Sequence, residues 1–414
     1  MKNKASLCAQ CKGARRLCGR PTCPILERIK ENVRVASAIT RREVFGSSPP
    51  SLLVGEWGYP RIRLGPLIPP VTGLDAREYD NPVVWWGRKT IEDIIRLRSS
   101  LILTESFVDA RLDAKRPDRL LEEIQELALS ALPVDAEARL RRRPTARLRF
   151  DGVLSPVGPR APLERLRIVG NPSVPRKVDQ IVYDTDAKAA IAVEELYRYG
   201  VSPYHIVRLL SVGLLGEAKQ RRIVPTRWAI TATDTILGNI LLRRIRGYPE
   251  IDDIELYYTE YLGNRYAIVM CPGSWSFEMI EIWLPRSVWV GGGAPYICVN
   301  YELWDGKCRV PGVDGGYHAI RFPVLERLFE RRRQATVIAI REVTPEYYAP
   351  LGSWQIRESV RNALRQKKRV FNSVMDALKA AARRLDTGLD KIIASSHLLK
   401  HLSGQTRIDR FLQS

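Results

Sequence analysis

Four cysteines lie within the first 23 residues, at Cys8, Cys11, Cys18 and Cys23. Their spacing, C-x2-C-x6-C-x4-C, lets four thiolates converge on one ion, and the first C-x2-C is typical of the knuckle that begins such sites. The segment is too short and polar to bury a core, so a metal would supply its folding free energy. We expect Zn²⁺, with an iron–sulfur cluster as the next option and two disulfides as the structural alternative.

A second pattern stands at the end of the chain, where Gln405, Ile408, Phe411 and Leu412 follow a helical stretch over 389–402. In one 3₁₀ turn, residues three apart share a face, so the three apolar side chains can form a plug. The amide of Gln405 both donates and accepts hydrogen bonds. This is typical of a docking peptide and resembles the box (the PIP motif) that tethers proteins to the DNA sliding clamp, PCNA. The alternative is a tail that folds back onto its own domain.

Carboxylates are the best candidates for catalysis. Asp184 and Asp186 follow an apolar run as Asp-x-Asp, and two carboxylates at a strand end can hold Mg²⁺ or Mn²⁺ against a phosphodiester. That would make the chain a metal-dependent nuclease. The structural alternative, which we favour, is capping of the helix expected from about Ala187. Glu278 and Glu281 lie on opposite faces of a predicted strand, so one of them can face inward.

Basic side chains cluster in dispersed segments. One cluster comprises Arg139, Arg141, Arg142, Arg143, Arg147 and Arg149. Arginines beside an aromatic ring suit a groove that binds phosphates and stacks bases. The segment that best combines the two supplies our predicted nucleic-acid-binding residues, namely Lys219, Arg221, Arg222, Arg227 and Trp228. For any one such run, the alternative is a solvated or salt-bridged face.

The overall charge supports a polyanionic partner. The 414 residues include 66 Lys and Arg against 46 Asp and Glu, a formal net charge of +20, for which nucleic acid is the usual partner and solubility the plain alternative. Hydrophobic residues at 45% and charged residues at 27% exclude wholesale disorder, collagen and disulfide miniproteins. Because neither a membrane-spanning apolar stretch nor a secretory signal is evident, we expect a cytoplasmic, nucleoid-associated protein without a membrane partner.

The elements that must position these residues indicate an α+β fold. Helical periodicity predicts helices near 88–103, 115–131, 186–215, 318–333, 354–367 and 370–384. Strand patterns appear near 252–261, 265–271, 275–284 and 334–343. With the best internal break at Gly291–Pro295, we predict a four-cysteine knuckle over 1–24, a large mixed domain over 25–290, a smaller C-terminal α/β domain over 291–402 and a flexible clamp-binding tail over 403–414.

Together these segments resemble the archaeal Nre family of DNA-repair proteins across nearly the whole chain. Besides the four cysteines and the terminal box, the resemblance rests on Gly58–Pro66, Leu154–Pro159, Asn171–Lys177 with Asp184–Asp186, Lys219–Trp228, Gly315–Arg321 and Pro350–Arg357. It implies two Nre-like domains, a role in DNA-damage repair and sliding-clamp binding through Gln405, Ile408, Phe411 and Leu412. It implies no particular reaction, so whether the protein is an enzyme stays open.

Overall fold

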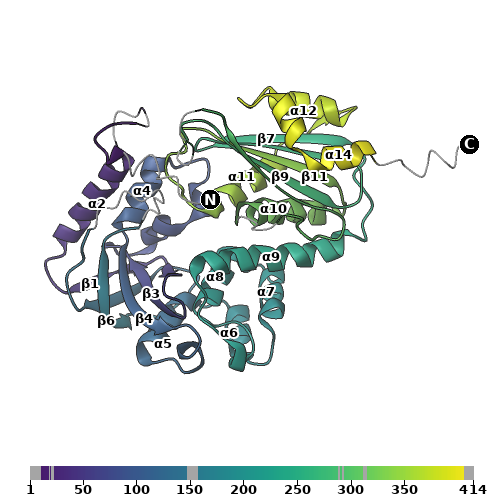
Figure 1. Ribbon diagram of the computed structural model, residues 1–414. Helices are drawn as coiled ribbons and strands as arrows, with labels where there is room; N and C mark the ends of the chain where they lie inside the picture. The colour runs from purple at the N-terminus through teal and green to yellow at the C-terminus, as the bar shows by residue number, and fades with distance from the viewer. Residues whose placement is uncertain are drawn as a thin grey trace, which may run out of the picture. The chain divides into compact units, whose positions relative to one another are not determined.

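The computed structural model describes residues 11–17, 19, 23–146, 157–287, 290, 293–310 and 315–404. The fold is mixed α+β with two six-stranded sheets, which confirms the predicted class (Figure 1). Contacts divide the chain into two compact units: unit 1 spans Met1–Leu237 with Ala349–Gly352, and unit 2 spans Gly238–Tyr348 with Ser353–Ser414. This division falls within a helix, upstream of the predicted break at Gly291–Pro295.

Unit 1 combines one sheet with a set of short helices. Its strands are β1 (Glu43–Ser48), β2 (Leu52–Val54), β3 (Arg61–Ile68), β4 (Ile102–Asp109), β5 (Val134–Leu140) and β6 (Arg160–Ile168). Its α-helices are α2 (Pro24–Ala38), α3 (Pro82–Trp85), α4 (Ile91–Ser100), α5 (Arg119–Leu129), α6 (Arg176–Tyr183), α7 (Ala189–Arg198), α8 (Pro203–Ser211) and the first part of α9 (Thr226–Ile245). Three 3₁₀ turns are η1 (Leu74–Asp80), η2 (Asp113–Lys115) and η3 (Ala218–Gln220).

The unit 1 sheet has the strand order β1-β5-β6-β4-β3-β2. Among the strand pairings that the structure describes in this sheet, β4–β6 is parallel and the others are antiparallel. In the β4–β6 pair, Leu103 lies opposite Arg160 although 57 positions separate them in sequence. Helix α5 packs on β6, and α2 packs on α4. The sheet thus brings together segments that have no local sequence relationship.

Local signals explain where the unit 1 helices begin. Thr90 and Asp93 form a capping box at α4, each side chain bonding the other's backbone N–H. Asp118 caps α5, whose apolar residues at helical spacing are buried on one face. The predicted helix over 88–103 is wrong at its end, because the chain leaves α4 at Ser100 and enters β4.

Unit 2 is built around the second sheet. Its strands are β7 (Ile254–Tyr261), β8 (Asn264–Cys271), β9 (Ser276–Trp283), β10 (Tyr296–Glu302), β11 (Thr336–Val343) and β12 (Arg369–Phe371). Its helices are the remainder of α9 with α10 (Gly315–Arg331), α11 (Ser353–Arg365), α12 (Val374–Ala382), α13 (Leu389–Ser395) and α14 (His397–Gly404). The bounds of β7, β8, β9, β11, α10, α11 and α12 agree closely with the prediction, whereas β10 and β12 were not predicted and the helical stretch over 389–402 is divided into α13 and α14.

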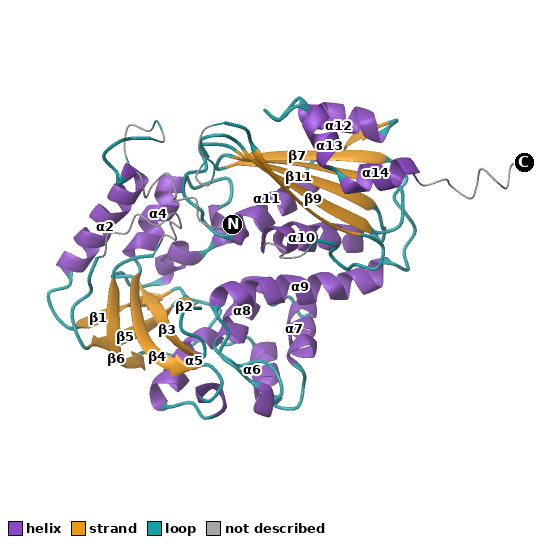
Figure 2. Ribbon diagram, viewed as in Figure 1, coloured by secondary structure: helices purple, strands orange, loops and turns teal. Residues whose placement is uncertain are grey.

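The unit 2 sheet, ordered β10-β9-β11-β8-β7-β12, lies between two helical layers (Figure 2). Helices α10 and α11 cover one face, and α12, α13 and α14 cover the other. Strand β11 pairs with β9 in parallel and with β8 antiparallel, and all eight of its residues are buried. Its apolar side chains Ile338 and Ile340 join the core beneath α12–α14.

Both glutamates of β9 are buried, one on each face. Glu278 accepts hydrogen bonds from the backbone N–H groups of His397 and Leu398 and from the Ser396 hydroxyl, so it caps α14. Glu281 forms a buried ion pair with Arg341 on the α10–α11 side. The expectation that one of them faces inward is thus exceeded, because sheet faces covered by helices on both sides bury both.

Of the helices that the structure describes, none combines the length and the apolar character that crossing a lipid bilayer requires.

Candidate nucleic-acid interface

Arginines converge on one cavity of unit 1. The cavity has a volume of about 1050 Å³. The basic residues that line it are Arg28, Arg61, Arg63, Arg141, Arg142 and Arg160. The acidic residues in its lining are Glu105 and Asp118. We call this site the arginine cavity; its excess of cations over carboxylates makes it suited to an anionic ligand.

Strand alternation explains how β3 supplies two of these cations. Side chains of a strand point alternately to its two faces. Ile62 and Leu64 are fully buried, and Arg61 and Arg63 therefore project to the exposed face. Because β3 pairs with β4, Arg63 lies directly opposite Phe107. A short apolar–basic alternation thus anchors the strand and presents guanidinium groups at the same time.

Glu105 of β4 orients two arginines of the cavity. One carboxylate oxygen accepts from Arg63 Nη1 and the other from Arg160 Nη1, each at 3.1 Å. The Glu105 side chain is only 12% exposed, whereas the two arginine side chains are about half exposed. A guanidinium has five N–H donors, so each arginine keeps donors for a second anion. The carboxylate therefore fixes the pair without using up its hydrogen-bonding capacity.

Two exposed aromatic rings line the same cavity. Phe107 is 58% exposed and lies 5.3 Å from the guanidinium carbon of Arg61 and 5.0 Å from that of Arg63. Trp57 is 89% exposed and stands on the turn before β3. In that turn Gly58 has φ of +87°, and a Cβ there would lie 2.8 Å from the carbonyl oxygen of Arg61. Glycine therefore permits the tight turn that presents Trp57.

A second cavity, of about 680 Å³, continues the basic surface. Its lining residues are Thr40, Arg41, Arg42, Glu43, Arg142 and Arg143. Arg142 lines both cavities, so arginines from the α2–β1 connection and from the end of β5 adjoin those of the arginine cavity. The cluster around Arg139–Arg143, noted in the sequence, is split: Arg139 pairs with Glu164 at 3.7 Å, while Arg141, Arg142 and Arg143 line cavities.

The predicted binding group around Lys219–Trp228 is divided as well. Arg221 donates to the backbone carbonyl oxygens of Gly216, Val182 and Asp184, and its partial burial lowers its pKa while Asp184 opposes that shift. Its guanidinium thus ties the segment of Val182 and Asp184 to that of Gly216. Lys219 and Arg222 are exposed side chains.

Arg227 and Trp228 lie beside the turn that carries Trp57. The Trp228 indole N–H donates to Glu56 at 3.2 Å, and Arg227 pairs with the same carboxylate at 3.6 Å. The Trp228 ring also packs on Tyr59, with 5.4 Å between ring centroids. The structure therefore connects this predicted pair to the Glu56–Tyr59 turn, although the arginine cavity itself was not predicted.

The Asp184 side chain stabilises a turn between α6 and α7. Its Oδ1 accepts from the backbone N–H groups of Asp186 and Ala187, at 3.1 and 3.2 Å, and both aspartates are exposed. These bonds form a turn ahead of α7 and are not the predicted helix cap, because the N-cap residue of α7 is Lys188 and no side chain caps that helix. Among the residues that the structure describes, no group of three or more His, Cys, Asp and Glu side chains is arranged to hold a metal ion.

Two of the four predicted metal ligands can be examined. Cys8 and Cys18 lie outside the described residues, so the four-cysteine knuckle is not shown. Burial would raise the pKa of the Cys11 thiol, but backbone N–H groups of the turn over residues 13–17 hydrogen-bond to it and lower the pKa overall. Such donors stabilise a thiolate, the form that binds Zn²⁺, so this turn fits a metal knuckle. Cys23 immediately precedes Pro24, the first residue of α2.

The terminal box lies outside the described residues, including Gln405, Ile408, Phe411 and Leu412. The structure describes the chain up to the end of α14 at Gly404.

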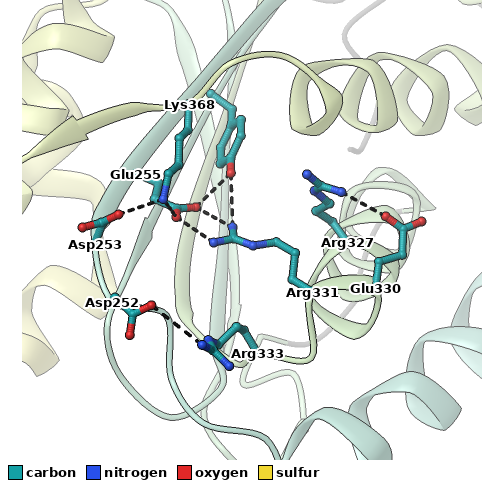
Figure 3. Close-up of polar contacts among 9 residues, drawn as sticks. Asp252, Asp253, Glu255, Arg327, Glu330, Arg331, Arg333 and Lys368 are labelled. Carbon is teal, nitrogen blue, oxygen red and sulfur yellow. Dashed lines mark hydrogen bonds and ion pairs between the residues drawn. The ribbon is translucent and has the colours of Figure 1, made fainter.

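Unit 2 contains a cluster of cations that pair with carboxylates (Figure 3). Glu255, fully buried on β7, accepts from Arg331 at 2.6 and 2.7 Å and from Lys368 at 2.7 Å. Lys368 also pairs with Asp253, and nearby Arg333 and Arg327 pair with Asp252 and Glu330. Burial would raise the pKa of Glu255, but these cations and the Tyr257 hydroxyl lower it to about 2. This network has the character of a structural ion cluster, in contrast to the arginine cavity.

Comparisons with known proteins identify the family. Residues 17–290 match the family described as Archaeal Nre, N-terminal, and residues 302–411 match Archaeal Nre, C-terminal. No solved structure matches the chain.

Three named relatives cover most of the chain. The chain is 40% identical to DNA repair protein NreA of Archaeoglobus fulgidus, over 92% of its own length and 94% of that protein. It is 35% identical to DNA repair protein NreB of the same organism, over 95% of this chain and 97% of that protein. It is also 35% identical to DNA repair protein NreA of Haloferax volcanii, over 86% of each. The chain therefore belongs to the archaeal Nre family.

Proposed function

We propose that this protein is a DNA-repair factor that binds the DNA backbone through the arginine cavity of unit 1. The repair role follows from its family, because relatives 35–40% identical to it are named DNA repair proteins. The observation that carries DNA binding is the convergence of six arginines from distant segments on one cavity. Guanidinium groups bind phosphate oxygens bidentately, and neutralised phosphates release counterions, which supplies most sequence-independent affinity.

The arrangement around Glu105 supports this assignment. Ion pairs with a solvent-exposed partner contribute little to stability, about 0–1 kcal/mol, and both arginines that pair with Glu105 are about half exposed, so these pairs are a poor explanation for the fold. They do hold Arg63 and Arg160 side by side, with N–H donors left for a phosphate. The aromatic pair Trp57 and Phe107 adds surface on which bases can stack.

Recruitment to the sliding clamp is the second part of the proposal. The box of Gln405, Ile408, Phe411 and Leu412 follows α14, which ends at Gly404. A docking peptide at this position would follow α14 directly in the sequence. Tethering to PCNA would raise the local concentration of the arginine cavity at DNA. A protein with both properties would act at the nucleoid.

A metal knuckle at the N-terminus is the third part. The donors around Cys11 fit a thiolate ligand, and Cys23 lies at the start of α2, so a bound Zn²⁺ would tie the N-terminal segment to that helix. An iron–sulfur cluster would use the same four cysteines, Cys8, Cys11, Cys18 and Cys23.

One experiment tests binding and chemistry together. Purified protein is incubated with labelled single-stranded, duplex and flap DNA in Mg²⁺ or Mn²⁺, beside an Arg63→Gln/Arg160→Gln variant and an Asp184→Asn/Asp186→Asn variant. We expect binding without cleavage, weakened in the arginine variant and unchanged in the aspartate variant. Cleavage that the aspartate variant loses would instead establish a metal-dependent nuclease. Equal binding by the wild type and the arginine variant would contradict the interface.

A further inference from the structure

The size and lining of the arginine cavity indicate which form of DNA it accepts. Small-molecule sites in proteins occupy about 300–1,000 Å³, so a volume of about 1050 Å³ is suited to a few nucleotides. In a double helix the faces of the bases are stacked on one another, and a protein reaches only the base edges, with elements that enter the grooves. A cavity with basic and aromatic walls is therefore better matched to nucleotides that are not base-paired.

The two aromatic rings of the cavity differ from those of a protein core. Trp57 is 89% exposed and Phe107 is 58% exposed, although each offers a large apolar face. Exposed single aromatics are common, but these two line one cavity and adjoin arginines. Bases of an unpaired strand stack on such rings regardless of sequence.

The arginines beside Phe107 also favour a base over another apolar ligand. The guanidinium carbons of Arg61 and Arg63 lie over the Phe107 ring, 5.3 and 5.0 Å from its centroid. A ligand in contact with Phe107 therefore meets positive charge within a few ångströms. A nucleotide, with a flat base joined to a phosphate, satisfies both features at once.

We propose that Trp57 and Phe107 are base-stacking residues of a single-stranded DNA site, in which Arg61, Arg63 and Arg160 contact the flanking phosphates. This inference rests on the proposed function and adds its substrate class: unpaired nucleotides, such as those of a gap, a flap or a flipped base. The phosphate contacts give affinity for any strand, and the stacking contacts distinguish a strand with bases from one without them.

The test uses two single strands of equal length, an oligothymidylate and an abasic strand, together with a duplex. The full-length protein is titrated with each by fluorescence anisotropy, as wild type, Trp57→Ala, Phe107→Ala and Trp57→Phe. Trp304→Ala is the matched control, because Trp304 is a 67% exposed tryptophan of unit 2. Both stacking positions are exposed, so their substitution leaves the core intact.

We expect Trp57→Ala and Phe107→Ala each to weaken oligothymidylate binding by about fivefold to hundredfold, with abasic and duplex binding unchanged. Trp57→Phe, which keeps an aromatic ring, should retain most of the affinity, and Trp304→Ala all of it. Equal losses on the abasic strand, or no loss on oligothymidylate, would overturn the stacking role while leaving backbone binding in place. Failure of the wild type to bind any of these DNAs would overturn the proposed function itself.

Discussion

Replacing Glu255 with glutamine should destabilise unit 2, because it removes one charge from the centre of a buried ion cluster. The carboxylate is fully buried and is held by Arg331, Lys368 and the Tyr257 hydroxyl (Figure 3). Glutamine keeps the shape of the side chain but leaves two cations facing a neutral amide.

The size of the effect follows from the pKa of Glu255. The folded protein lowers it from its ordinary 4.5 to about 2. At about 1.4 kcal/mol per unit this corresponds to about 3 kcal/mol. Because the side chains of Arg331 and Lys368 are 22% and 37% exposed, solvent screens part of this, and we expect about 2–3 kcal/mol.

The sign of the pH dependence is fixed by the same shift. A carboxyl whose pKa is lower in the folded than in the unfolded chain contributes stability that is complete above its ordinary pKa of 4.5. That contribution is lost as the pH falls from 4.5 toward 2. The difference in stability between wild type and Glu255→Gln should therefore be largest near neutral pH and shrink in acid.

The assay is unfolding in urea, in which amide hydrogen exchange of β7 and β8 is the readout. Exchange at these strands reports on unit 2 even if unit 1 unfolds separately. Glu330→Gln is the matched control, since Glu330 pairs with Arg327 at 3.2 Å in the same cluster but is 58% exposed. Its effect should stay below about 0.5 kcal/mol. If the two variants are equally stable, or if the Glu255→Gln difference is the same at neutral and acid pH, the reasoning fails.

Three further perturbations follow from the structure and the sequence. Burial lowers the pKa of His205 to about 3, so below pH 6.5 the unfolded chain binds a proton at this residue and the folded chain does not. The stability of the protein should therefore fall as the pH drops, and His205→Gln should reduce that fall in acid denaturation curves. Cys11→Ser should reduce the zinc content measured by elemental analysis and lower the melting temperature of the N-terminal segment, whereas the same zinc content in both proteins would contradict the knuckle. Phe411→Ala in a tail peptide should weaken clamp binding about tenfold or more in a calorimetric titration, and unchanged affinity would exclude the box.

Sequence patterns predicted unit 2 better than unit 1. In unit 2, the last six residues of β8 are an apolar run and α11 has clear helical periodicity, so such elements could be located from their own residues. In unit 1, β4 directly follows α4 after Ser100, and the apolar residues continue across the junction without a turn signal. A prediction from periodicity alone therefore extends the helix past its true end.

The arginine cavity was missed because its residues are distant in sequence. Glu105 meets Arg63 and Arg160 only through the pairing of β4 with both β3 and β6. One local signal was available: Arg61-Ile-Arg63 is an alternating pattern that places both arginines on one strand face.

The motif Gly58–Pro66 now has a structural explanation. Gly58 allows the turn that presents Trp57, and Gly65 lets β3 approach β4, since a Cβ there would lie only 1.4 Å from the carbonyl oxygen of Thr104. The two arginines of the motif, Arg61 and Arg63, lie between these glycines and line the arginine cavity. By contrast, the predicted Arg221 binds backbone carbonyls, a use that charge clustering in a sequence does not distinguish from phosphate binding.

The most direct test of DNA binding through the arginine cavity is the salt dependence of single-stranded DNA affinity. Each phosphate contact contributes about 0.7 to the slope of log K against log salt concentration, so Arg63→Gln/Arg160→Gln should lower the slope by about 1.4. Arg96→Gln, which removes a 69% exposed arginine of α4 paired with Asp93, should leave the slope unchanged. A slope that is the same in the wild type and the double variant would contradict the account.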